Sequence, residues 1–212
     1  MSEMPLAYFI SFTTYGTWLH GRDPGSVDHA HNQLGTPCLP PDESLEQAER
    51  GQLTQPPDRL DAGRRTVVLE TIREVCRHRG WRLWAVHVRS NHVHVVVTAA
   101  VKPEKVMADF KAYASRRLRE HFKEASDRKR WTEHGSTRYL WKEDRVHEAI
   151  DYVLNRQGTP MAVHDGREML FGSQSEPEAS ARATLADASG SDDDKSKIKA
   201  TARSINDCTH PP

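Results

Sequence analysis

Cysteine is scarce in this 212-residue chain, and its three cysteines lie far apart, at positions 38, 76 and 208. An odd number at such spacing predicts neither a disulfide framework nor a Cys-x-x-Cys metal site. Long apolar runs are missing as well, since no stretch reaches the roughly 18 residues of a membrane span. The opening Met-Ser-Glu-Met-Pro lacks a signal-peptide pattern. These absences predict a cytoplasmic protein with reduced thiols.

Net charge is also missing, because 30 Lys and Arg side chains balance 30 Asp and Glu side chains. Any surface for nucleic acid must therefore be local. Residues 101–145 carry 13 basic and 8 acidic side chains, an excess of five. Such a segment is either a solvated face or a surface for a phosphate-bearing partner. The side chains that we expect to contact DNA are Lys111, Arg116, Arg117, Arg119, Arg130 and Trp131.

Hydrophobic periodicity predicts four strands and three helices in the first 160 residues. The strands are expected at 7–19, 81–89, 92–98 and 138–142, and the helices at 64–79, 102–122 and 144–157. Strand, helix, strand, strand, helix, strand is the ferredoxin-like order, here with one more helix appended. The fold class predicted is therefore α+β, an antiparallel sheet with helices on one face. The other face would be left for a ligand or partner.

The domain organisation follows from composition. Residues 1–171 are predicted to form one domain, interrupted by an insertion at 26–63 that is rich in Pro, Gly, Gln and Asp. A short helix is expected within it, near 42–52. Residues 172–212 contain almost no large apolar side chains, so we expect a disordered, low-complexity tail.

The strand that begins at residue 92 carries the strongest chemical signal. Side chains alternate along a strand, so His92 and His94 face one way while three valines between and after them face the other. Two imidazoles on one strand face can bind a metal ion with a third ligand from elsewhere. The alternative is a pair of half-buried histidines with no ligand. His29 and His31 repeat the spacing, but in a polar loop, and His87 is more readily explained as a core histidine.

A tyrosine stands out on the appended helix at 144–157. Its apolar stripe consists of residues 146, 149, 150, 153 and 154, and Tyr152 lies roughly 130° from the centre of that stripe at about 100° per residue. A phenol can attack phosphorus and form a covalent phosphotyrosine. It needs help from a metal or a cation to ionise at neutral pH, since free tyrosine titrates near 10. Arg156 is a candidate for that help.

These residues carry a resemblance. The segment Asn91-His92-Val93-His94-Val95-Val96-Val97 resembles the His-hydrophobe-His motif of the HUH single-strand endonucleases. Residues 152–157, Tyr-Val-Leu-Asn-Arg-Gln, are similar to the tyrosine helix of their single-tyrosine transposases, and residues 13–21 are similar to first strands of this group. That branch includes small insertion-sequence transposases and REP-associated tyrosine transposases. The resemblance covers roughly residues 5–160.

The resemblance implies a function. Members bind hairpin or other single-stranded DNA, cut it with the tyrosine, remain joined to the 5′ phosphate and rejoin strands. They use Mg²⁺ or Mn²⁺ and generally act as dimers. By position, Tyr152 matches the nucleophile, and His92 and His94 match the histidine pair. The family usually supplies a polar third ligand about one turn after the tyrosine. We favour Gln157 for it, with Asn155 and Glu148 as alternatives.

Two other functions compete with this one. A ferredoxin-like protein that only binds single-stranded nucleic acid would need no more than the basic helix with Trp131 and Tyr139 for stacking. A nucleotide hydrolase of the histidine-triad kind would need a third alternating histidine, and position 96 is valine. Nicking that depends on a metal and on Tyr152 separates the first alternative from the transposase.

Overall fold

The computed structural model describes residues 4–19 and 42–167. His29, His31, the first part of the 26–63 insertion and the expected tail at 172–212 lie outside the described residues. The elements in chain order are β1 (Ala7–Thr13), α1 (Glu43–Gly51), α2 (Ala62–Arg79), β2 (Arg82–Val88), β3 (His92–Thr98), α3 (Pro103–Phe122), β4 (Ser136–Leu140), α4 (Glu143–Asn155) and β5 (Ala162–Asp165).

Local sequence signals explain most of these boundaries. α2 begins after Asp61, whose side chain accepts a hydrogen bond from the Arg64 N–H group, and ends at Gly80 in the left-handed conformation. α3 begins with Pro103, which fits the first helical position because that residue needs no N–H partner. The short helix expected near 42–52 is α1. The tyrosine-bearing helix α4 ends two residues earlier than the sequence predicted.

The strands form one antiparallel sheet in the order β4-β1-β3-β2-β5. The first four strands have the ferredoxin-like order, so the predicted α+β fold class is confirmed. Strand β5, which the sequence did not predict, is a four-residue strand that pairs with β2 at the sheet edge. The central pair β1–β3 places Ser11 opposite His94 and Thr13 opposite His92.

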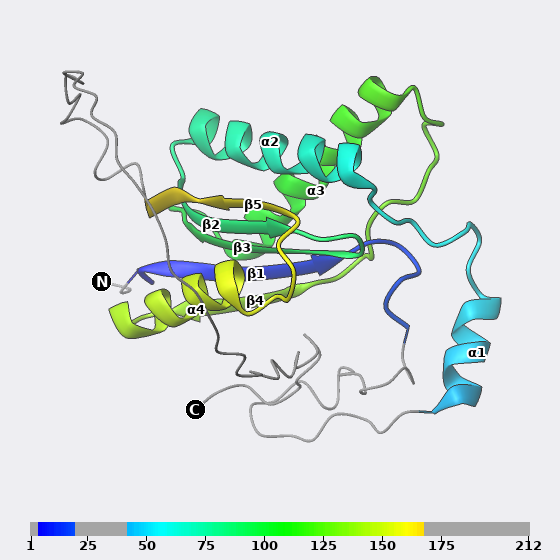
Figure 1. Ribbon diagram of the computed structural model, residues 1–212, viewed down its shortest axis with the longest axis horizontal. Coiled ribbons are helices and arrows are strands. Elements are labelled where there is room, and N and C mark those ends of the chain that lie inside the picture. Colours follow the sequence, from blue (N-terminus) through cyan, green and yellow to red (C-terminus); the bar gives the residue numbers. More distant parts are fainter. Residues whose placement is uncertain (1–3, 20–41, 168–212) are drawn as a thin grey trace, which may run out of the picture.

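Helices α2 and α3 cover one face of the sheet, as Figure 1 shows. The larger hydrophobic core lies between them and the sheet, and it contains Val93, Val95 and Val97 of β3. Alternation along the strand therefore turns the two histidines to the opposite face. None of the helices in the described ranges is long and apolar enough to cross a membrane.

The sequence predicted that the second face of the sheet would be left open for a ligand or partner, but this face is partly covered. Helix α4 packs across part of it, on the side away from α2 and α3 (Figure 1). A smaller core forms there from Val146, Ile150 and Val153 of α4 against sheet residues that include Ala85 and Val96. The apolar stripe of α4 is therefore buried against this face of the sheet. The tyrosine helix thus lies on the same face as the histidines.

Candidate active site

The two histidines of β3 lie next to each other beneath α4. Their ring centroids are 4.7 Å apart. The Nδ1 atom of each ring has a polar partner: Asn91 Oδ1 lies 2.8 Å from that of His92, and Ser11 Oγ lies 2.6 Å from that of His94. The ring of Phe9 stacks on His94 at a centroid distance of 5.5 Å. Neighbouring side chains therefore hold both imidazoles in place.

Gln157 joins this pair because α4 stops before it. The helix ends at Asn155 and is capped at Arg156, and Gly158 follows in the left-handed conformation with φ 72°. This break carries the Gln157 side chain to the interior, where it is fully buried. On a continued helix the side chain would have lain over the apolar stripe, roughly 140° from Tyr152.

Three polar atoms at this place have no hydrogen-bond partner. They are Nε2 of His92, Nε2 of His94 and Oε1 of Gln157, and all three are buried. A buried polar atom without a partner costs about 1–3 kcal/mol, so three together call for a ligand. A divalent cation would satisfy two imidazole nitrogens and an amide oxygen at once. The residues present thus fit a metal ion.

The alternative third ligands lie elsewhere. Asn155 is exposed and donates to Asp151 Oδ1 at 2.8 Å, and Glu148 is exposed and pairs with Arg145 at 2.9 Å. Among the described residues no group of three or more His, Cys, Asp or Glu side chains could hold a metal. Of the three candidate third ligands, Gln157 is therefore the one that is buried with the histidine pair.

Tyr152 lies beside the histidines. Its half-buried ring packs edge-on against His94 and Phe9, with centroid distances of 5.7 and 5.9 Å. Arg156, which the sequence suggested as an aid to ionisation, is exposed and paired with Asp151 at 2.7 Å. The described structure thus brings Tyr152 to the histidine pair and directs Arg156 to a different partner.

Burial sets the charge of the imidazoles. Desolvation lowers the pKa of His92 to about 4, against a smaller upward effect of the Gln157 side chain, and it holds the pKa of His94 well below its usual value. The positive charge of Arg89 adds to both decreases. Both rings are therefore neutral at pH 7, which is the protonation state that coordinates metals.

His87 is the satisfied core histidine that the sequence favoured. It is fully buried on β2, in register with His94. Its Nδ1 lies 3.1 Å from the carbonyl oxygen of Val153, and its Nε2 lies 3.2 Å from the backbone nitrogen of Met161. A carbonyl accepts and an N–H donates, so the ring proton is on Nδ1. His87 therefore ties the end of α4 to the sheet.

Three of the six expected DNA contacts bind within the protein: Arg130 is buried, and Lys111 and Trp131 are half-buried. The Trp131 ring packs on Phe12 and its Nε1 donates to the Lys111 carbonyl and to Ser115, while Arg130 is 5% exposed and pairs with Glu124 at 2.7 Å. The Lys111 ammonium donates to the carbonyl oxygens of residues 132, 133 and 134. These side chains stabilise the 124–134 segment through contacts within the protein.

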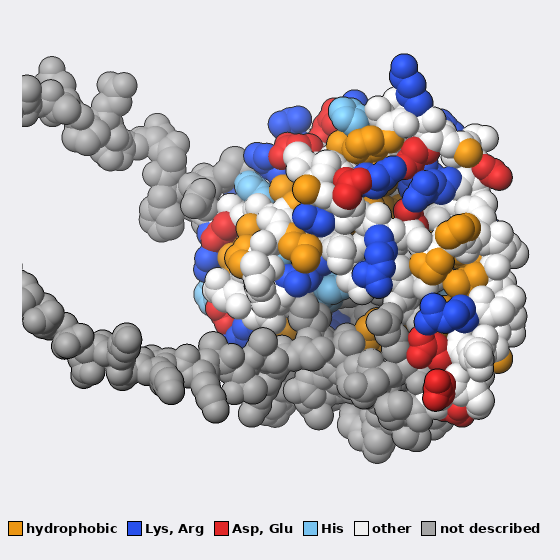
Figure 2. All heavy atoms as spheres, turned by 45° about the vertical axis from the view of Figure 1, so that its right-hand side comes forward, with side chains coloured by type: hydrophobic (Ala, Val, Ile, Leu, Met, Phe, Trp, Pro, Cys, Tyr) orange, Lys and Arg blue, Asp and Glu red, His pale blue; other side chains and the backbone are white. Residues whose placement is uncertain are grey.

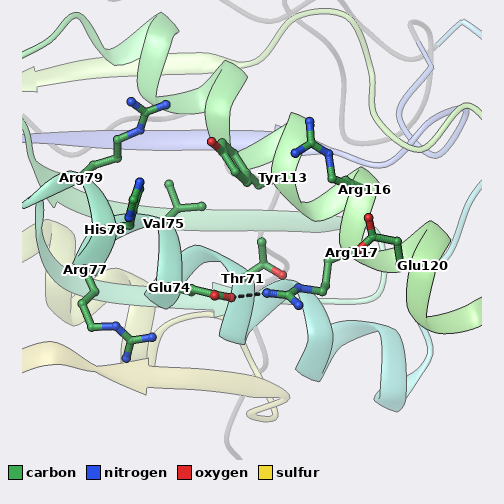
Figure 3. Close-up of a pocket in the computed structure, with 10 residues that line it drawn as sticks. All are labelled: Thr71, Glu74, Val75, Arg77, His78, Arg79, Tyr113, Arg116, Arg117 and Glu120. Atoms are coloured by element: carbon green, nitrogen blue, oxygen red, sulfur yellow. Dashed lines mark hydrogen bonds and ion pairs between the residues drawn. The ribbon is translucent and has the colours of Figure 1, made fainter.

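The other three, Arg116, Arg117 and Arg119, are exposed on α3. Arg116 and Arg117 line a groove of about 590 Å³ between α2 and α3, together with Arg77, Arg79 and the half-exposed Tyr113 (Figure 3). Glu74 pairs with Arg117 across this groove at 2.5 Å. On the face shown in Figure 2, basic and acidic side chains lie interspersed. The groove is therefore a local basic feature on a neutral protein.

Sequence reasoning missed Ser11 and Phe9, the β1 side chains that contact His94. Strand alternation alone could have placed both on one face of β1. The β1–β3 register places Ser11 opposite His94 and Phe9 opposite Val96, and no local pattern specifies that register.

Part of the chain is similar to a known protein family. Residues 58–150 match the family model described as "Transposase IS200 like", a segment that contains both histidines and ends two residues before Tyr152. No curated protein matches the sequence.

Two solved structures are similar at low sequence identity. One is a REP-associated tyrosine transposase bound to a REP hairpin, with 9% identity, 72% of this chain and 68% of that chain covered, and a TM-score of 0.38. The other is a protein of Deinococcus radiodurans R1 described as a transposase, with 14% identity, 73% and 92% covered, and a TM-score of 0.36. By the family-model match, residues 58–150 are similar to the family of IS200-like transposases.

Proposed function

We propose that this protein is a transposase that cuts and rejoins single-stranded DNA through a covalent 5′-phosphotyrosine at Tyr152. In this proposal His92, His94 and Gln157 hold a divalent metal ion, Mg²⁺ or Mn²⁺. The observation that carries the proposal is the group of three unpartnered buried atoms on these ligands, next to the tyrosine ring. The resemblance of both motifs to the single-tyrosine transposases supports the same function.

The chemistry assigned to Tyr152 is a phosphoryl transfer in two steps. The phenol oxygen attacks the phosphorus of a backbone phosphodiester, and the bond from phosphorus to the 3′ oxygen breaks. The phenol loses its proton and the leaving oxygen gains one, which gives a free 3′ hydroxyl. Attack of a 3′ hydroxyl on the phosphotyrosine then rejoins DNA and returns the phenol.

The side chains around Tyr152 have separate tasks in this scheme. Phe9 and His94 fix the orientation of the phenol ring by their edge-on contacts. The neutral imidazoles and the Gln157 oxygen present lone pairs to the cation. When bound, a divalent ion polarises the scissile phosphate and offsets the charge that develops in the transition state.

The proposed partner is single-stranded or hairpin DNA. The exposed guanidinium groups of Arg116, Arg117 and Arg119 are proposed to contact its phosphates. The resemblance further implies a homodimer, and sedimentation of the full chain should give twice the 24.1 kDa chain mass.

The test is a search for a covalent adduct. The full-length protein is incubated with Mn²⁺ and a pool of single-stranded hairpins that includes the flanks of its own gene, and the products are separated on a denaturing gel. We expect a protein–DNA adduct that is absent in EDTA. Tyr152→Phe should abolish the adduct and leave hairpin binding within a few-fold, because the lost oxygen is a nucleophile and not an affinity contact.

Tyr139→Phe is the matched control, because Tyr139 is an exposed tyrosine of β4. This variant should still form the adduct. His92→Ala should lose metal-stimulated cleavage. An adduct that persists in Tyr152→Phe would refute the assigned nucleophile. Hairpin binding without any adduct under Mg²⁺ or Mn²⁺ would favour the non-catalytic binding protein.

A further inference from the structure

We infer that Asn91 and Ser11 are positioning residues that hold His92 and His94 in the tautomer protonated on Nδ1, so that both Nε2 lone pairs face the proposed metal site. The inference rests on the proposed function, because it concerns the same site. It assigns roles to two residues that do not themselves touch the metal.

The hydrogen bond of His92 fixes its proton. Asn91 Oδ1 lies 2.8 Å from His92 Nδ1, and an amide oxygen can only accept. Nδ1 must therefore carry the hydrogen. A neutral imidazole has one ring proton, so Nε2 of His92 is a bare lone pair. That atom is buried and has no partner, in agreement with this assignment.

The hydrogen bond of His94 does not by itself assign its tautomer, because the Ser11 hydroxyl can donate or accept. Oγ of Ser11 lies 2.6 Å from His94 Nδ1. If the ring proton were on Nε2, it would be a buried donor without an acceptor, which is rarer and more costly than an unpaired lone pair. Protonation on Nδ1 gives the proton an acceptor in Ser11.

With both histidines in this tautomer, the site favours a cation. Nε2 of His92, Nε2 of His94 and Oε1 of Gln157 are then three acceptors in a buried place, and none of them has a donor. Three lone pairs repel one another and attract a cation. Partners behind metal-ligating histidines generally fix the ring in this way, and losing one costs about 10- to 100-fold in metal affinity.

The first measurement needs no metal and no activity. Long-range proton–nitrogen correlation spectra of the ¹⁵N-labelled, metal-free protein report which ring nitrogen carries the proton. We expect Nδ1 protonation for both His92 and His94 in the wild type. Nε2 protonation of His92 would overturn the inference, even if the protein forms the DNA adduct. This result does not depend on whether any variant folds.

Variants provide the second measurement, with Mn²⁺ affinity as the readout. Asn91→Ala should weaken Mn²⁺ binding about 10- to 100-fold and lose the single tautomer. Asn91→Asp should restore both, because a carboxylate can only accept; failure of this rescue would mean that the Asn91 amide donates to the ring. Ser11→Ala and Ser11→Thr form the corresponding pair for His94.

Ser90→Ala, one residue before Asn91, is the control and should change neither readout. Asn91→Ala with the wild-type tautomer and affinity would refute the positioning role. Absence of Mn²⁺ binding in the wild type would refute the proposed metal site, while the spectra would still decide the tautomers. The two failures are therefore distinguishable.

Discussion

Gln157 is a side chain whose burial is unfavourable for the stability of the fold. It is fully buried, its Oε1 has no partner, and its Nε2 donates to the Tyr152 carbonyl only over 3.4 Å. Methionine has a similar volume and no oxygen to desolvate. A protein selected only for stability would therefore be better served by an apolar side chain here.

We predict that Gln157→Met raises the free energy of unfolding in EDTA by roughly 1 kcal/mol, because an unpaired buried oxygen is removed. The same change should weaken Mn²⁺ binding by roughly tenfold or more, since a ligand is lost. Urea unfolding and titration calorimetry measure the two effects. Asn155→Ala is the control, because Asn155 is exposed and should leave Mn²⁺ binding unchanged. Wild-type Mn²⁺ affinity in Gln157→Met would remove Gln157 from the ligand set.

At the scale of elements, the site depends on how α4 is fastened to the sheet. His87 of β2 bonds the Val153 carbonyl at the end of α4 and the Met161 N–H group just before β5. It thereby braces the segment that contains both Tyr152 and Gln157.

His87→Leu should therefore expose two unpaired backbone groups, at a cost of about 1–3 kcal/mol each. Hydrogen exchange should become faster at Met161 and in the last turn of α4, while the α2–α3 layer keeps its protection. His147→Ala, an exposed position on the same helix, is the control. Unchanged exchange at Met161 would show that His87 contributes packing and not attachment.

A second junction joins α2, α3 and the segment that follows α3. Glu124 is 8% exposed and pairs with Arg64 of α2 at 2.5 Å and with Arg130 at 2.7 Å. Burial alone would raise the pKa of Glu124, but hydrogen bonds from Arg64 and Arg130 and the charge of Arg128 hold it below its ordinary 4.5.

A carboxyl group whose pKa is lowered by folding stabilises the fold at pH values above its pKa in the unfolded chain. This contribution is lost as pH falls through its pKa in the folded protein. Glu124→Gln should therefore lower the free energy of unfolding by about 3 kcal/mol at pH 7, because the buried guanidinium group of Arg130 and the partly buried one of Arg64 lose their charged partner. The difference from wild type should shrink as pH falls below about 4.5, where Glu124 of the unfolded wild-type chain becomes protonated, and should be smallest below the lowered pKa of the folded protein. Urea unfolding at pH 7 and at lower pH measures this, with exposed Glu120→Gln as the control. A difference independent of pH would contradict the ion-pair account.

The whole molecule presents different chemistry on its two sides. The histidines and Tyr152 lie on the α4 face of the sheet, whereas the basic groove lies between α2 and α3 on the other side (Figures 1 and 3). A DNA segment that used both would have to extend from one side of the sheet to the other. Binding at the groove and cutting at the tyrosine should therefore be separable.

The double variant Arg116→Gln, Arg119→Gln changes one arginine that lines the groove and one exposed arginine of the same helix, and it tests this separation. If both guanidinium groups neutralise phosphates, hairpin affinity should fall. The slope of log affinity against log salt should also become shallower, by about 0.7 to 0.9 for each phosphate that the variant leaves without a cation. The adduct yield at saturating DNA should not change. Arg73→Gln is the control, since Arg73 pairs with Glu70 on α2 at 2.9 Å. An unchanged salt slope would place the DNA-contacting surface elsewhere.

Much of this protein could be predicted from its sequence, because the decisive patterns are local. Alternation along a strand follows from backbone geometry alone, so His92 and His94 could be assigned to one face and the valines to the core. Helical periodicity and end signals located α2 and α3 closely. The order of these elements then led to the ferredoxin-like sheet.

Other features were decided only by tertiary structure, because they depend on contacts between distant segments. The choice of sheet face for α4, the turn of Gln157 into the interior after the helix end, and the pairing of Ser11 with His94 all result from packing and register. Trp131 shows the same limit, since an aromatic residue in a basic loop is equally compatible with stacking on DNA and with its actual place against Phe12. The sequence by itself determined most of the elements, with β5 as the exception, and the shared strand face of the two histidines. The tertiary structure decided which other side chains meet that pair, because their positions are set by long-range burial and not by local geometry.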